Sequence, residues 1–303
     1  MIYTVTLNPA IDYIMRVKSL KHDDINRSYY EELHYGGKGI NVSVVLKRLG
    51  LKNTALGFTA GFTGEYLEEL LRAEGVDCAF LRLDSGNTRI NVKIETDTQI
   101  DINARGPEIS EEEIEKFIGF TDKLRSGDYL ILAGSVPENL PGDIYERILS
   151  RLAGRGVSFI ADTTGELLLN VLKYEPFLIK PNHRELGELF GVTAESEEDI
   201  VFYARKLIEK GAQNVLVSRG EDGAVLISGK GGVLSAGAAK GDAVNTVGCG
   251  DSMVAGFLAG YIETGDMSYA LKLGTAAGSA TAFCRGLASK EDIKSIMRLK
   301  GKS

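Results

Sequence analysis

Tyr129-Leu130-Ile131-Leu132-Ala133 is the stretch of this 303-residue chain that decides its fold class. A short apolar run between polar residues is typical of a strand buried on both faces of a sheet. Similar runs recur at residues 157–161, 177–179 and 215–217, with amphipathic segments between them. This alternation predicts a mostly parallel sheet with helices on its faces. Right-handed connections would then place ligands at the carboxyl ends of the strands.

One helix of this pattern has a clear beginning. Ser110 and Glu113 have the spacing of a capping box, in which each side chain bonds the backbone N–H of the other residue. We therefore expect a helix that opens at Ser110 and runs to about Leu124.

Two stretches, at about residues 11–35 and 87–105, interrupt the alternation. They are richer in polar and β-prone residues, and apolar side chains alternate at Ile90, Val92 and Ile94. Thr96-Asp97-Thr98 fits a hairpin turn. We expect antiparallel strands in a small sheet apart from the main one. They could be surface hairpins, or a lid or subunit contact, because a small isolated sheet seldom stabilises itself.

Composition and charge exclude several classes of protein. The net charge is -7 and no run of Lys or Arg marks a nucleic-acid footprint, so no nucleic-acid partner is expected. Three separate cysteines without a CxxC pair suggest neither a disulfide framework nor a zinc site. No signal peptide is evident and no apolar run approaches the roughly 20 residues of a membrane span. We expect a cytoplasmic protein with no membrane partner.

The strongest local signal is Asn245-Thr246-Val247-Gly248-Cys249-Gly250-Asp251-Ser252, which precedes an apolar stripe at helical spacing. Glycines let a ligand approach the backbone, and the N–H groups and dipole at a helix start favour an anion. Such a nest can stabilise charge on a transferring phosphoryl group. Alternatively, Asp251 only caps the helix. Neither a Walker A motif nor a G-x-G-x-x-G fingerprint occurs, which disfavours P-loop and nicotinamide-dependent Rossmann enzymes.

A second glycine-rich segment, Gly36-Gly37-Lys38-Gly39-Ile40-Asn41, leads into a helix that Gly50 should stop. Its glycines would let a polyhydroxylated ligand touch the backbone, while Lys38 offers a cation and Asn41 an amide. Taken alone, the segment could equally be a tight turn with an exposed lysine.

Two further segments are ambiguous by themselves. Lys180-Pro181-Asn182-His183-Arg184-Glu185 follows an apolar strand, and Asn182 could simply cap the next helix. Ser218-Arg219-Gly220-Glu221-Asp222-Gly223-Ala224 could simply be a hairpin turn between two strands.

Taken together and in this order, the four segments resemble the ribokinase-like sugar kinases of the phosphofructokinase B family, over essentially the whole chain. The segment from Thr6 to Asp12 resembles the family's opening strand with its sugar-binding aspartate. Residues 36–41 match the first family signature and residues 245–256 the second. The resemblance implies a single domain of residues 1–303. Its fold would be a three-layer α/β/α sandwich with a small β-sheet lid, forming a homodimer through the lids.

The resemblance also implies the chemistry, which is the transfer of a phosphoryl group from ATP to a sugar hydroxyl. Asp251 would be the general base, and the backbone N–H groups of Gly248, Cys249 and Gly250 would stabilise the developing charge. We expect the helix N-terminus to depress the pKa of Asp251. Cys249 departs from the alanine or serine that is commoner there. A thiol at this place is either oxidisable or inert and buried.

The implied binding residues fall into three groups. The sugar would contact Asp12, Gly37, Asn41 and Asn103, and its phosphate would meet Lys38, Arg89 and Arg27 in the lid. Arg89 is favoured because a planar guanidinium suits bidentate phosphate binding. The nucleotide would contact Lys180, Asn182, Ser218, Gly220, Gly223, Gly250 and Ser279. Glu185 would act on magnesium through Mg-ATP, and a monovalent cation could bind near Asp242 and Val244.

Asn8-Pro9-Ala10-Ile11-Asp12 and residues 101–109 most resemble family members that phosphorylate fructose 1-phosphate to fructose 1,6-bisphosphate. Tagatose 6-phosphate and fructose 6-phosphate remain rival substrates. An unphosphorylated substrate would leave Lys38 and Arg89 without an anionic partner. A non-catalytic sugar-phosphate sensor is the alternative from another class, and it would have no need of Asp251.

Overall fold

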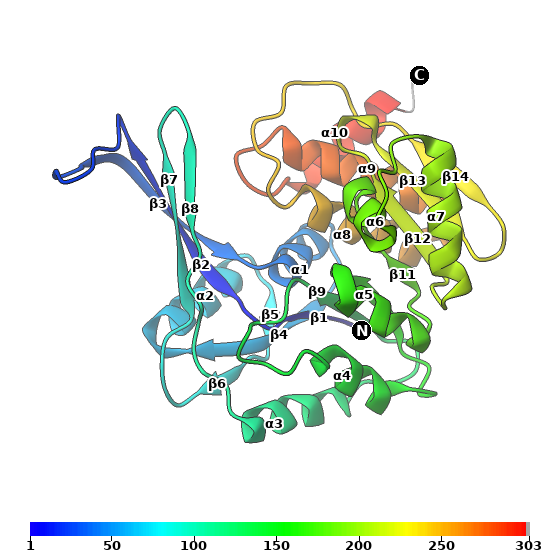
Figure 1. Ribbon diagram of the computed structural model, residues 1–303, viewed down its shortest axis with the longest axis horizontal. Coiled ribbons are helices and arrows are strands. Elements are labelled where there is room, and N and C mark those ends of the chain that lie inside the picture. Colours follow the sequence, from blue (N-terminus) through cyan, green and yellow to red (C-terminus); the bar gives the residue numbers. More distant parts are fainter. Residues whose placement is uncertain (301–303) are drawn as a thin grey trace.

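The computed structural model describes residues 1–300, so the last three residues of the expected single domain lie outside the described part. Its main sheet has ten strands, nine of them in the order β14-β13-β12-β11-β10-β9-β1-β4-β5, with β6 paired to β4 (Figure 1). Their bounds are β1 Ile2–Thr6, β4 Asn53–Ala60, β5 Asp77–Cys78, β6 Leu81–Leu83, β9 Tyr129–Ala133, β10 Ser158–Asp162, β11 Leu178–Ile179, β12 Asn214–Ser218, β13 Ala224–Ser228 and β14 Val233–Ala236.

The prediction of a mostly parallel sheet is confirmed. β9 pairs in parallel with β1 on one side and β10 on the other, and only β12–β13 and β13–β14 are antiparallel. The run at residues 157–161 becomes a strand shifted by one residue, Ser158–Asp162. The final residue of that strand is therefore an acid at the carboxyl edge of the sheet.

Helices cover both faces of the sheet, which makes three layers (Figure 1). Side chains alternate across β9, so Leu130 and Leu132 join one buried cluster and Ile131 joins the other. The first cluster lies under α3 to α7, and the second under α1, α8, α9 and α10. Bounds are α1 Lys38–Arg48, α2 Gly61–Ala73, α3 Glu111–Thr121, α4 Ile144–Leu152, α5 Gly165–Val171, α6 His183–Phe190, α7 Glu197–Glu209, α8 Cys249–Thr264, α9 Met267–Ala282 and α10 Lys290–Lys300, with short 3-10 turns η1 Leu172–Tyr174 and η2 Gly220–Asp222.

Local signals mark the helix ends as expected. Both bonds of the Ser110–Glu113 capping box are present at the start of α3, although the helix ends at Thr121 rather than near Leu124. After α1, Gly50 has a φ of 98° and stops the helix. Within residues 1–300, no helix combines the length and apolar character that crossing a bilayer requires.

Close packing of α8 against α9 fixes the helix whose first turn begins at Cys249. A methyl group at Gly256 would lie 2.7 Å from the Leu273 carbonyl oxygen, and one at Gly274 would lie 2.8 Å from that of Met253. The two helices can approach this closely only because both positions lack a side chain. The first turn of α8 is thereby held against the body of the protein.

A four-stranded sheet of order β3-β2-β7-β8 projects from the body (Figure 1). The two segments expected to form a small sheet supply these strands: β2 Ala10–Val17, β3 Ser28–Gly36, β7 Arg89–Glu95 and β8 Gln99–Ile102. The expectation that all strands are antiparallel was wrong, because β2 and β7 are parallel. β2 and β7 each follow parallel strands of the main sheet, β1 and β6, which end at one edge, so both enter the small sheet in the same direction.

Candidate active site

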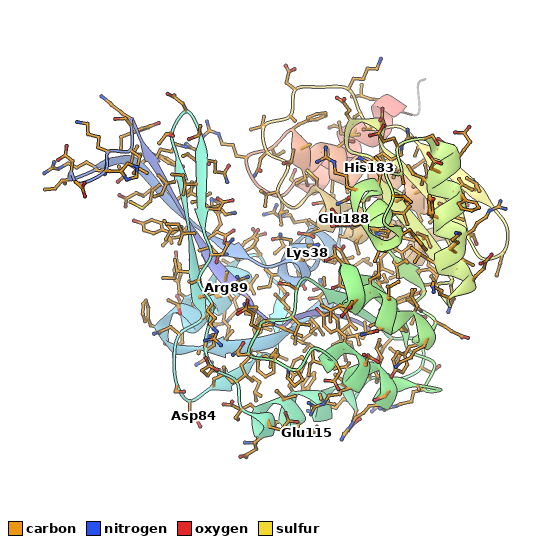
Figure 2. All side chains as sticks on the ribbon, viewed as in Figure 1. Lys38, Asp84, Arg89, Glu115, His183 and Glu188 are labelled. Atoms are coloured by element: carbon orange, nitrogen blue, oxygen red, sulfur yellow. The ribbon has the colours of Figure 1, made fainter. Side chains whose placement is uncertain are left out.

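A cavity of about 690 Å³ lies at the carboxyl ends of the central parallel strands, the edge at which the sequence predicted ligand binding. Residues at or just beyond the ends of β1, β9, β10, β11 and β12 line it, together with the first turns of α1, α6 and α8. Figure 2 shows Arg89 at the foot of the projecting sheet and Lys38 near the middle of the molecule, at the start of α1.

The structure brings most of the predicted site residues to this cavity. The predicted residues that line it are Gly37, Lys38, Asn41, Arg89, Lys180, Asn182, Glu185, Ser218, Gly248, Gly250 and Asp251. The predicted residues outside its lining are Asp12, Arg27, Asn103, Gly220, Gly223, Cys249 and Ser279. Lining residues that sequence reasoning missed include Asn8, Ser135 and Thr163.

Asp251 lies in the first turn of α8 and is 6% exposed. Gly248 occupies the N-cap position of that helix. The Asp251 carboxylate instead accepts a hydrogen bond of 2.8 Å from Asn41 Nδ2, which joins the starts of α8 and α1. This arrangement speaks against the alternative in which Asp251 only caps its helix.

The expected depression of the Asp251 pKa was wrong. Burial, followed by the negative charge of Asp162, raises the pKa of Asp251 to about 6. The hydrogen bond from Asn41 and two nearby lysines oppose this rise without cancelling it. The local sequence pattern shows the helix N-terminus, but it shows neither the depth of the site nor a second carboxylate nearby.

Asp162, the last residue of β10, is the functional candidate that sequence reasoning missed. It is 1% exposed, and its Oδ1 lies 3.3 Å from Lys180 Nζ and 3.7 Å from Lys38 Nζ. Two lysines from different elements therefore share one buried carboxylate. A signal was available, since an acid directly after a buried parallel strand must lie at the carboxyl edge of the sheet.

Lys180 is buried between the two acids. Burial alone would lower the pKa of Lys180, but the nearby carboxylates, Asp162 foremost, outweigh burial and raise it. Lys180 is therefore a firmly protonated, buried cation beside the cavity. A methyl group at Gly250 would lie 3.0 Å from Lys180 Nζ, so this glycine makes room for the ammonium group at the start of α8.

Gly248, on the other side of Cys249, is needed for its backbone conformation and for close packing. Its φ of 79° is left-handed, and a methyl group there would lie 2.6 Å from Leu287 Cδ2. Cys249 between them is half-buried, and burial together with the charge of Asp251 raises the pKa of its thiol to about 11. A thiol that stays protonated is a poor nucleophile, which favours the inert alternative for this cysteine.

Arg89 lies at the start of β7 and is anchored by the backbone. Its Nε and Nη2 donate to the Asn8 carbonyl oxygen at 3.2 and 3.0 Å. Burial lowers the pKa of Arg89, while Asp12 opposes that effect. An arginine keeps its charge in such surroundings, so a fixed cation faces the cavity.

The remaining predicted residues occupy other places. Arg27 and Asn103 are exposed, the first before β3 and the second after β8. Ser279 on α9 accepts a hydrogen bond from the Ala239 backbone N–H. Near the expected cation site, the Val244 N–H donates to the Ala282 carbonyl oxygen at 2.7 Å.

For residues 180–185 and 218–224, the simpler interpretations, a helix cap and a hairpin turn, describe the local structure correctly. Asn182 caps α6 in a full capping box with Glu185. Gly220 and Gly223 lie in a hairpin between β12 and β13, closed by a bond from the Arg219 N–H to the Gly223 carbonyl oxygen. Asn182 and Glu185 nevertheless line the cavity as well, so capping and ligand contact are compatible there.

The donor set fits a magnesium ion held mainly by a nucleotide. Among residues 1–300, no group of three or more His, Cys, Asp or Glu side chains could hold a metal ion. Single carboxylate oxygens are available, because Asp162 Oδ2 is buried without a hydrogen-bond partner and only one oxygen of Glu185 bonds the Asn182 N–H. Mg²⁺ usually takes one or two carboxylates and completes its shell with phosphate oxygens and water.

Known proteins similar to this chain are carbohydrate kinases. The family described as pfkB family carbohydrate kinase matches residues 5–294. The 1-phosphofructokinase of Bacillus subtilis is 46% identical over 98% of this chain and 97% of its own length. The D-tagatose-1-phosphate kinase of Bacillus licheniformis is 41% identical over 95% and 94%. A crystal structure of Escherichia coli phosphofructokinase-2 in complex with potassium superposes with a TM-score of 0.92, at 28% identity and 99% coverage of both chains.

Proposed function

The chain belongs to the pfkB family of carbohydrate kinases, and we propose that it transfers the γ-phosphoryl group of ATP to fructose 1-phosphate. The free primary hydroxyl of the sugar attacks, its bond to phosphorus forms as the bond to ADP breaks, and fructose 1,6-bisphosphate leaves. The observation that carries the kinase chemistry is the meeting of Asp251, Lys180 and the start of α8 at one cavity. The substrate is supported by the near-full-length likeness to the Bacillus subtilis enzyme.

Asp251 is the proposed acceptor of the hydroxyl proton. A carboxylate with a pKa of about 6 is ionised at neutral pH, yet it is more basic than an ordinary aspartate. The hydroxyl proton can leave late, because phosphoryl transfer has a loose transition state. Positioning and charge stabilisation then supply most of the acceleration, through Lys180 and the backbone N–H groups of residues 248–250.

The phosphosugar is proposed to lie between the projecting sheet and α1. Lys38 and Arg89 would bind the phosphate it already carries, with Arg27 as a third cation. Gly37, Asn41, Asp12 and Asn103 would meet its hydroxyls. Asn41 also bonds Asp251, so the same amide could orient the base and the sugar.

ATP is proposed to lie on the other side of Lys180. Its phosphates would contact Lys180, Asn182 and Gly250, and the rest would pass Ser218, Gly220, Gly223 and Ser279. Magnesium bound with ATP would neutralise charge on the phosphate oxygens, with Glu185 as its protein partner. A monovalent cation is proposed near Asp242 and Val244, and the existence of a potassium complex of Escherichia coli phosphofructokinase-2 supports the cation, though not its place. A homodimer through the projecting sheets remains part of the proposal.

One observation favours a second candidate substrate. The Bacillus licheniformis relative is named for D-tagatose 1-phosphate, which differs from fructose 1-phosphate only in the configuration of one hydroxyl. Both sugars carry a phosphate at one end and a primary hydroxyl at the other. The distance between the phosphate cations and Asp251 therefore cannot separate them, and discrimination must come from groups that contact the hydroxyls.

A coupled assay of ADP formation tests the proposal with fructose 1-phosphate, tagatose 1-phosphate, fructose 6-phosphate, tagatose 6-phosphate, ribose and adenosine. We expect kcat/KM for fructose 1-phosphate to exceed each of the others by roughly tenfold or more, about 1.4 kcal/mol. An epimer whose kcat/KM equals or exceeds that of fructose 1-phosphate would overturn the substrate assignment and leave the kinase chemistry intact. Binding of sugar phosphates without turnover of any of them would support the sensor alternative.

A further inference from the structure

Asp12 on β2 has both carboxylate oxygens held by β7. Its Oδ1 accepts a hydrogen bond of 2.9 Å from Asn91 Nδ2, and its Oδ2 lies 2.9 Å from Lys93 Nζ. The side chains of Asp12 and Lys93 are 15% and 16% exposed, so solvent screens their ion pair only weakly. We name Asp12, Asn91 and Lys93 the Asp12 clamp.

The parallel register of β2 and β7 creates this clamp. Asp12 pairs with Asn91, and Lys93 lies two residues further along the same strand. Side chains two apart share a face of a sheet, so Arg89, Asn91 and Lys93 all point to the side on which Asp12 lies. Because Arg89 lines the cavity, the clamp lies on the face of the projecting sheet that continues from it.

Gly36 on β3 leaves room for the clamped carboxylate. A methyl group at this position would lie 2.8 Å from Asp12 Oδ1 and 3.0 Å from its Cγ. The backbone of Gly36 does not have a left-handed φ, so its conformation does not demand glycine. Space for the Asp12 carboxylate is therefore a sufficient reason for a glycine at this position.

We infer that Lys93 is a positioning residue which, with Asn91, fixes Asp12 so that it accepts hydrogen bonds from particular sugar hydroxyls. The inference rests on the proposed function and deepens it. Each carboxylate oxygen can accept more than one hydrogen bond, so the clamp leaves acceptor capacity for the ligand. A polar group held in advance loses less free energy on binding, and it cannot turn to suit an epimer. The clamp would thus set the stereochemical preference of the kinase.

Lys93→Met tests this, because methionine keeps most of the length and removes the charge. We expect KM for fructose 1-phosphate to rise about tenfold, as for loss of one charge-assisted contact, with KM for ATP unchanged. The preference for fructose 1-phosphate over tagatose 1-phosphate should fall at the same time. An unchanged KM for fructose 1-phosphate together with an unchanged preference between the two sugars would overturn the inference.

Arg16→Met is a matched control. Arg16 lies on the same face of β2, further from the cavity, and pairs with Glu95 of β7 at 2.7 Å. Its loss removes ion pairs with Glu95 and Glu32 from the same sheet, and a contact with the Tyr30 ring, without touching Asp12. We expect it to change neither KM nor the epimer preference. Equal effects of Arg16→Met and Lys93→Met would mean that sheet stability is the cause, and would overturn the inference.

A double-mutant cycle with Asp12→Asn separates positioning from direct contact. If Lys93 acts through Asp12, Lys93→Met should add little in the Asp12→Asn background. Additive losses would show that Lys93 binds the substrate itself and would overturn the positioning role. Gly36→Ala should reproduce the raised KM and weaker preference with every charge retained, because its methyl group displaces Asp12 Oδ1.

Calorimetric binding of fructose 1-phosphate and tagatose 1-phosphate to the same variants keeps the two proposals distinguishable. A wild-type protein that binds both sugars but turns over neither would overturn the proposed function, and the binding preference of Lys93→Met would still decide the role of the clamp. An active wild-type enzyme with an equally selective Lys93→Met variant would overturn the clamp alone. Wild-type protein that binds no sugar phosphate would overturn both.

Discussion

Asn41 Nδ2 donates a hydrogen bond of 2.8 Å to Asp251 Oδ2, across 210 positions of the chain. The bond ties the first turn of α1, in the half that bears the projecting sheet, to the first turn of α8. The proposed general base is thereby held by a residue that also faces the proposed sugar position. Ligand binding beside α1 would act directly on the orientation of the base.

Asp251→Asn should fold and bind ATP but lose at least roughly a hundredfold in kcat, the low end for removal of a general base. Asparagine keeps the shape and cannot accept the hydroxyl proton. Steady-state kinetics and ATP titration measure the two effects separately. Glu263→Gln, an exposed acid in the last turn of the same helix, should retain wild-type kcat. Near-normal turnover of Asp251→Asn would reduce Asp251 to a structural residue.

The pH dependence of kcat should show an acidic limb near pH 6. Asp251 must be ionised to accept a proton, and burial beside Asp162 raises its pKa to about 6. Turnover should therefore fall about tenfold for each pH unit below that value, when a single protonation is responsible. A profile that stays flat down to pH 5 would contradict this assignment.

Asp162→Asn should move that acidic limb to lower pH. The variant removes the negative charge that helps to raise the pKa of Asp251, so the base stays ionised in more acidic solution. It also takes a carboxylate from Lys180, and we expect a higher KM for ATP. Asp122→Asn, which breaks surface pairs with Arg151 and Arg155, is the control and should leave the limb in place.

Stability should depend on Asp251 in the opposite sense to activity. Its folded pKa is raised, so the folded state binds the proton more tightly than the unfolded chain. The ionised carboxylate thus costs stability above about pH 6, and this cost disappears as the pH falls toward the ordinary aspartate value. Asp251→Asn should be more stable than wild type at pH 8, with a smaller difference at pH 4.5. Chemical denaturation at both pH values measures this, and a less stable variant at pH 8 would contradict it.

Arg89→Ala should raise KM for the phosphosugar far more than KM for ATP. Loss of a charge-assisted contact costs about 1.5–3 kcal/mol, or roughly 10- to 150-fold. Arg82→Ala is the control, since Arg82 pairs with Glu65 and Glu68 on the surface. An equal rise for both substrates would show that the sugar phosphate does not lie at Arg89.

Neighbours in the sequence determined much of the scaffold. Apolar runs such as residues 129–133 have the length of one strand, and their lack of polar residues predicts a strand buried on both faces of a parallel sheet. The Ser110–Glu113 box and Gly50 mark helix ends through bonds and φ angles within one turn. The glycines at positions 248 and 250, followed by an apolar stripe, likewise predicted where α8 begins.

Tertiary structure decided which of these pieces meet and what charge each group carries. Asp162 reaches Lys180 only because β10 and β11 are adjacent in the sheet, and it reaches Lys38 only because α1 begins beside them. The Asp12 clamp exists only because β2 and β7 pair in parallel, a direction that two separate hairpins do not specify. The pKa of Asp251 could not be predicted from its helix start alone, because the burial and the second carboxylate that raise it come from elements far apart in the chain. Coulomb energies and desolvation depend on distances through space, and those distances exist only once the strands are ordered.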